Sequence, residues 1–255
     1  MNVGPLKSMR PLTVSSLRRP LALLGLWGAS LLGQVPAGFF FGESSLRLAI
    51  PDLDPSGVAR SHTASGLGTG FAYDLTVRLV IEGTGFGAFN GDYYAYLRHE
   101  TPDGSGSSLA VLLNRVGRGV TTPSGYSESG FNVTLSDAAT WDIHRYQVAL
   151  GGAIDGTLTG LWQPDGRRVD PAVSLDTSPR TAPLEPLGNL DPNGSWTLFL
   201  ADLEAGGTGR LVEWEVRGTP RIPSVVVPEP RSVALAWAGV GLLGWVWHRR
   251  RMHRR

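Results

Sequence analysis

The chain has 255 residues, no cysteine and a formal net charge of only +1. Without cysteine, disulfide bonds, thiolate nucleophiles and cysteine metal ligands are excluded, so a folded domain must be stabilised by its core. The charge is uneven: four basic residues lie near the N-terminus and five near the C-terminus, which leaves 14 basic against 22 acidic residues. The central part is therefore acidic, near −8, which argues against nucleic acid and anionic lipid as its partners.

A secretory signal peptide is predicted over residues 1–37. Lys7 and three arginines precede the apolar stretch 21–32, and Val35-Pro36-Ala37 places small or medium side chains at the positions that a signal peptidase reads. We expect cleavage after Ala37. The alternative, a permanent membrane-spanning helix, is disfavoured because 12 apolar-rich residues are well short of the roughly 20 that a span needs.

Seven short stretches after the signal peptide have the composition and alternation of β-strands. The clearest of them places Leu75, Val77, Leu79 and Ile81 on one face. The seven stretches are 75–81, 93–98, 109–113, 131–135, 158–162, 196–201 and 211–217. Turn-forming Asn-Gly and Asp-Gly pairs separate several of them. This series predicts an all-β domain over residues 38–219, an antiparallel jelly-roll β-sandwich.

Three segments of the chain are predicted to lack strands. Residues 136–140 favour a short helical turn, whereas residues 164–186 are rich in proline and favour a long loop. Residues 220–226 contain two prolines and show no alternation, so they are predicted to be a linker that follows the domain.

The C-terminal tail, residues 227–255, carries three features in order. Val227, Pro228, Glu229 and Pro230 form a short extended motif, the apolar run 232–247 follows it, and arginines end the chain. We expect the apolar run to form a single transmembrane helix. Because it has only 16 residues, this helix would be marginal as an anchor. The arginines would stay on the cytoplasmic side.

This tail resembles the PEP-CTERM sorting signal. The resemblance implies that an exosortase processes the chain, which would be tethered to the membrane transiently through its C-terminus. It also implies delivery to the cell surface or the extracellular matrix of a Gram-negative bacterium.

Two further stretches, 190–202 and 206–216, each contain a tryptophan and are joined by a glycine-rich connection. We interpret them as a hairpin whose second strand turns Val212, Trp214 and Val216 inward. The two stretches resemble the C-terminal half of the proprotein-convertase P domain, also called P/Homo B.

Similarity to the P domain extends more weakly upstream as far as Ala49, and therefore covers nearly the whole predicted domain. The resemblance implies a jelly-roll β-sandwich. In that family the domain normally follows a subtilisin-like catalytic domain, which it stabilises. Only about 48 residues precede Ala49, so we expect no protease domain before it.

No catalytic residue is predicted, and we expect the protein not to be an enzyme. His62, His99 and His144 are the histidines of the predicted domain, and none lies in a recognisable hydrolase signature. A surface or packing role is expected for each of them.

No metal ligand is assigned and no cofactor is expected, although calcium is left open. Oxygen-rich turns at Asp52 and Asp54, at Asp191 and Asn193, and at Asp202 offer the hard ligands that calcium prefers. The same residue types also form Asx turns without any metal.

The tyrosines of the stretch 93–98 suggest a binding surface. Strand alternation places Tyr94 and Tyr96 on one side and Tyr93 on the other. One side packs in the core, and the other could stack on sugar rings or on another protein. The first functional hypothesis is an exported, non-catalytic binding, adhesion or structural module whose partner is an extracellular polysaccharide or a surface protein. The alternative is an accessory domain in proteolysis that acts in trans with a subtilisin-like serine protease.

Overall fold

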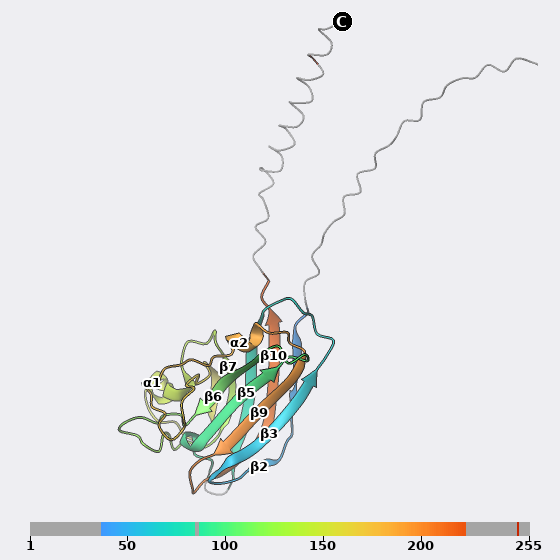
Figure 1. Cartoon of the computed structure of the whole chain (residues 1–255). Helices are drawn as coiled ribbons and strands as arrows, with labels where there is room; N and C mark the ends of the chain where they lie inside the picture. Colours follow the sequence, from blue (N-terminus) through green and yellow to red (C-terminus); the bar gives the residue numbers. More distant parts are fainter. Residues whose placement is uncertain (1–36, 85–86, 223–248, 250–255) are drawn as a thin grey trace, which may run out of the picture. The chain divides into compact units, whose positions relative to one another are not determined.

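The computed structural model describes residues 37–84, 87–222 and 249, and most of them belong to two β-sheets (Figure 1). The strands of the larger sheet, sheet A, are β1 (Phe39–Glu43), β2 (Leu48–Ile50), β4 (Tyr73–Thr84), β7 (Phe131–Ser136), β8 (Leu158–Trp162) and β10 (Thr208–Pro220). Their order is β1-β10-β4-β7-β8, and β2 also pairs with β10.

The smaller sheet, sheet B, has four strands. They are β3 (Asp54–Ala64), β5 (Tyr93–Glu100), β6 (Ser107–Asn114) and β9 (Gly194–Asp202), in the order β3-β9-β5-β6. Short helices lie in the connections: η1 (Asn90–Asp92), η2 (Ile143–Arg145), α1 (Tyr146–Leu150) and α2 (Glu185–Gly188). The prediction of an all-β domain is therefore confirmed.

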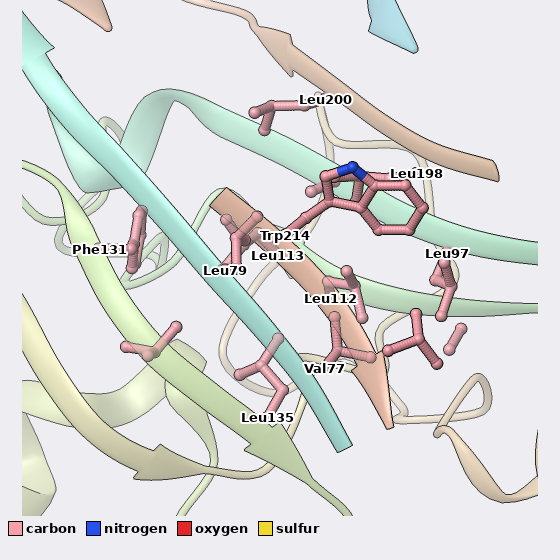
Figure 2. Packing of buried hydrophobic residues seen from close by; sticks show 14 of the residues in the cluster. Val77, Leu79, Leu97, Leu112, Leu113, Phe131, Leu135, Leu198, Leu200 and Trp214 are labelled. Atoms are coloured by element: carbon pink, nitrogen blue, oxygen red, sulfur yellow. The ribbon is translucent and has the colours of Figure 1, made fainter. Parts of the chain in front are cut away.

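The hydrophobic core lies between the two sheets. In β4 the alternating residues Val77, Leu79 and Ile81 are completely buried, as their spacing predicts. Figure 2 shows side chains of sheet A, such as Leu79 and Trp214, packed together with leucines of sheet B. The large buried aromatic and aliphatic side chains give the domain a core that needs no disulfide bond.

All seven predicted strands are present, and six of them extend beyond the predicted bounds. The strands β1, β2 and β3 were not predicted. In β3 the sequence contains Pro55 and Gly57, which disfavour a regular strand, and several polar residues. These residues are tolerated because β3 lies at the edge of sheet B and pairs with β9 alone.

The predicted hairpin between residues 190–202 and 206–216 is wrong. β9 pairs with β3 and β5 in sheet B, whereas β10 pairs with β1, β2 and β4 in sheet A. The connection thus crosses from one sheet to the other. The predicted inward position of Val212 is also wrong, because the register shifts between Leu211 and Glu213. This irregularity leaves Val212 partly exposed and turns Leu211 inward, while Trp214 and Val216 are buried as predicted.

Two smaller expectations also need correction. The sheets are not wholly antiparallel, because β7 and β8 pair in parallel. Residues 136–140 form a turn closed by a hydrogen bond from Ala139 N to Ser136 O (3.1 Å), not a helical segment. The proline-rich stretch 164–186 is largely irregular, as predicted, and α2 begins at its end.

Both ends of the folded domain lie at the same end of sheet A. Phe39, the first residue of β1, pairs with Gly218 near the end of β10. β10 has 13 residues, so its start at Thr208 lies about 40 Å from that end at the usual rise per residue. The turns around Thr208 therefore face away from the end where the chain enters and leaves the domain.

Candidate functional site

His99 and His62 are held by ring stacking. His99 is fully buried, and its ring lies on Trp196 with 3.9 Å between the centroids. Both ring nitrogens of His99 face backbone oxygens, Nδ1 at 3.2 Å from Ser195 O and Nε2 at 2.7 Å from Asp191 O. His62 on β3 stacks on Phe41 at 4.4 Å. These contacts give both histidines a packing role.

His144 belongs to a buried ion-pair network that also contains Asp142, Asp165 and Arg167. Its Nδ1 is 2.7 Å from the Oδ2 of Asp165, and neither side chain is exposed to solvent. Its Nε2 is 3.0 Å from the backbone oxygen of Arg118. Both ring nitrogens are therefore engaged with fixed oxygen atoms.

Arg167 completes this network and is itself buried. Its Nη2 lies 2.7 Å from Asp142 Oδ2, and its Nη1 lies 3.2 Å from Asp165 Oδ1. Its guanidinium also donates to the backbone oxygens of Leu175 and Asp176. The network fastens the irregular stretch after β8 to the sandwich. Sequence reasoning missed it because Asp142 and His144 lie on the other side of β8 from Asp165 and Arg167, and His144 and Asp165 are 21 residues apart.

An aromatic face lies on the side of sheet B that points away from the core. It consists of Tyr94, Tyr96 and Phe199, which are all partly exposed. Tyr96 and Phe199 stack with centroids 4.9 Å apart and an interplanar angle of 16°. Tyr94 lies 6.0 Å from Tyr96 and 6.4 Å from Phe199. The three rings thus form one continuous surface across two neighbouring strands.

A hollow of about 360 Å³ borders this aromatic face. It is lined by Tyr96, Arg98, Leu109 and Arg168, together with two serines of β6. Arg98 also forms an ion pair with Glu100 at 2.5 Å. The hollow therefore places the ring of Tyr96 beside the hydrogen-bond donors of arginine and serine side chains.

The predicted division of the tyrosines is confirmed. Tyr93 is fully buried, whereas Tyr94 and Tyr96 are on the opposite side of β5. Phe199 was missed as a member of the face, because its pairing with Tyr96 depends on the register between β5 and β9. The sequence offered one signal: Phe199 lies between Leu198 and Leu200, so strand alternation places it on the opposite face from these two leucines.

Of the oxygen-rich turns considered for calcium, Asp54 and Asp202 are paired across β3 and β9, whereas Asp191 and Asn193 precede the opposite end of β9. Asp191 Oδ1 accepts hydrogen bonds from Asn193 N and Nδ2, at 2.9 and 2.7 Å. Asp54 Oδ1 accepts from Ser56 N at 2.9 Å. These two turns are satisfied by their own neighbours. Within the ranges that the structure describes, no group of three or more histidine, cysteine or acidic residues stands ready to hold a metal ion.

Several predicted features lie outside the described residues. These are the signal peptide, except for its last residue Ala37, the sorting motif from Val227 to Pro230 and the apolar run 232–247. The part of the chain that the structure describes contains no helix of the length and apolar character required to cross a membrane.

The described residues define a two-sheet β-protein with an aromatic face. No protein-family model and no curated protein matches the chain. It is similar to two solved structures of a serine protease of Aeromonas sobria. One, a complex with its chaperone, shows 13% identity and a TM-score of 0.35 over 74% of this chain and 28% of that one. The other, of the protease, shows 11% identity and a TM-score of 0.35, and the match covers 72% of this chain and 27% of the protease chain. This chain spans about a quarter of their length, and such similarity supports no functional statement.

Proposed function

We propose that this chain is an exported, non-catalytic binding module that holds a polysaccharide of the cell envelope or extracellular matrix on its aromatic face. The observation that carries the proposal is the stack of Tyr94, Tyr96 and Phe199 on the side of sheet B that faces away from the core.

Packing within the domain does not explain these three rings. The core side of β5 and β9 is filled by other residues, among them Tyr93 and Trp196. A solvent-facing side of an antiparallel sheet ordinarily carries polar residues. Three partly exposed rings instead present flat apolar surfaces, which suit the apolar face of a sugar ring, and the two tyrosines add hydroxyl groups that can bond to the hydroxyls of the sugar. The arginines and serines of the adjoining hollow supply further donors.

The absence of catalysis is part of the proposal. A general base needs a ring nitrogen that reaches the proton of a nucleophile or of water. Both nitrogens of His99 and of His144 are engaged with fixed oxygen atoms, and His62 is stacked on Phe41. We therefore assign these histidines to the stability of the sandwich.

The binding proposal predicts that Tyr96→Ala and Phe199→Ala each weaken polysaccharide binding about tenfold. We take the loss of one stacked sugar ring to be at the lower end of the about 1–3 kcal/mol that a nucleic-acid base gains on an aromatic side chain. The measurement is affinity gel electrophoresis of the full chain in gels that contain exopolysaccharide from the native host. Phe40→Ala is the matched control. Phe40 is an exposed ring on β1 of the other sheet, so its loss should leave binding unchanged.

Two results would contradict the binding proposal. One is equal binding by the Tyr96 and Phe199 variants and the unchanged chain. The other is no binding of the polysaccharide together with stoichiometric co-purification of a subtilisin-like protease, which would instead establish the accessory function in proteolysis.

Export and sorting form the second part of the proposal. The tail resembles a PEP-CTERM signal, and the domain leads into it from the end of β10, beside the start of β1. Glu229→Ala is expected to abolish processing, because the motif from Val227 to Pro230 is the segment that we expect an exosortase to read. Mass spectrometry of the protein from cell and medium fractions measures this. Glu185→Ala, a change of an exposed glutamate in α2, serves as the control, and unchanged processing of the Glu229 variant would refute the use of the motif.

A further inference from the structure

The outward side of sheet B carries two arginines beside its aromatic face. Arg98 follows Tyr96 by two residues on the same side of β5, a separation of about 7 Å along the strand. Arg168 comes from the irregular stretch after β8. Both arginines line the hollow that Tyr96 also lines. Tyr96, Arg98 and Arg168, which come from two distant parts of the sequence, therefore border one space.

Arg168 is the arginine of the hollow that is available to a ligand. Arg98 is paired with Glu100, whereas the exposed side chain of Arg168 has no ion pair or hydrogen bond within the part of the chain that the structure describes. Its charge also reaches the aromatic face. Burial raises the pKa of the Tyr94 hydroxyl, and the positive charge of Arg168 acts in the opposite direction. A cation with unused donors thus stands beside two rings of the face.

The surroundings of the rings do not supply Arg168 with a counter-charge. Ala59 is paired with Phe199 across β3 and β9, and the next pair on the same side consists of Ser61 and Thr197, whose hydroxyl oxygens are 2.9 Å apart. The carboxylate nearest to Arg168 along the chain, Asp170, caps Ala172 N at 2.8 Å. The domain as a whole is acidic, but physiological salt screens exposed charges beyond about 8 Å. The arginine beside the rings therefore decides which ligand charge is favoured there.

We propose that the polysaccharide on the aromatic face is acidic: its sugar rings stack on Tyr96 and Phe199, and the carboxylate of a uronic acid pairs with Arg168 in the adjoining hollow. This inference rests on the proposed function and specifies the class of ligand. The planar guanidinium group presents its donors in a fork that matches the two oxygens of a carboxylate. A neutral sugar would use the rings and the hydroxyl groups of the face, but it would leave Arg168 without a partner.

The test compares exopolysaccharide from the native host before and after chemical reduction of its carboxyl groups to alcohols. Reduction removes the negative charge and keeps the sugar rings. Affinity gel electrophoresis of the full chain measures both affinities. We expect the acidic polymer to bind about fivefold more tightly than the reduced polymer, the upper end for one exposed ion pair. This difference should disappear at high salt, because an exposed ion pair is screened.

Three variants separate the charge from the stacking. Arg168→Gln should lower binding of the acidic polymer to the level of the reduced polymer and leave binding of the reduced polymer unchanged. Arg47→Gln is the matched control, because Arg47 is also exposed and lies just before β2 of the other sheet; this variant should keep the full difference between the polymers. Tyr96→Ala should weaken binding of both polymers, since both retain their sugar rings.

The outcomes separate this inference from the proposed function. Equal binding of the two polymers by the unchanged chain, or a difference that persists in Arg168→Gln, would overturn the acidic ligand and leave the binding function standing. Binding of neither polymer would remove the proposed function and this inference with it.

Discussion

Asp165→Ala is expected to lower the free energy of unfolding by about 3–5 kcal/mol, the usual cost of breaking a buried ion pair. Asp165 is fully buried and faces His144 at 2.7 Å and Arg167 at 3.2 Å. Its Oδ2 also accepts from Asn114 N at 3.1 Å. Removal of the carboxylate leaves the buried Arg167 with less compensation and leaves a donor of β6 without its partner.

Urea denaturation followed by tryptophan fluorescence measures this effect. Asp170→Ala is the matched control, because Asp170 is exposed in the same proline-rich stretch. Its carboxylate accepts one hydrogen bond from a described residue, from Ala172 N. Its loss should change the free energy of unfolding by less than about 1 kcal/mol. Equal stabilities of the two variants would show that the network contributes nothing to the fold.

Glu128→Gln is expected to lower the free energy of unfolding by about 2–4 kcal/mol at pH 7. Glu128 is buried, with 6% of its surface exposed. Its carboxylate accepts hydrogen bonds from the Tyr146 hydroxyl at 2.7 Å, Gln147 Nε2 at 2.6 Å and Ile154 N at 3.0 Å. Both carboxylate oxygens accept hydrogen bonds, whereas a glutamine has one oxygen and one NH₂ group. The NH₂ group of the glutamine would therefore face at least one of these three donors, and that hydrogen bond would be lost.

The effect of Glu128→Gln should depend on pH. Burial raises the pKa of Glu128, but the hydrogen bonds from Tyr146, Ile154 and Gln147 outweigh it and lower the pKa below its ordinary value. A lowered pKa in the folded state adds stability above the unfolded pKa of about 4.3, and this stability is lost as pH falls through the folded value. The difference in unfolding free energy between the unchanged chain and the variant should therefore narrow between pH 5 and pH 3. A difference that stays constant over this range would contradict the assignment.

Part of the candidate site could be predicted from the sequence. The alternation in β5 correctly separates the buried Tyr93 from Tyr94 and Tyr96, because side-chain direction in a strand is a local property. Phe199 could not be assigned to the same surface, since it is about a hundred residues away and meets Tyr96 only through strand pairing.

The sequence by itself determined the all-β class, the position of seven strands and the residues of β4 that face the core. These features follow from local periodicity and turn-forming residues. Only the tertiary structure decided that β9 and β10 lie in different sheets and that β7 and β8 run parallel. It also placed Val212 partly outside and Leu211 inside. Strand pairing and register depend on contacts between distant segments, and a single bulge reverses the direction of the side chains that follow.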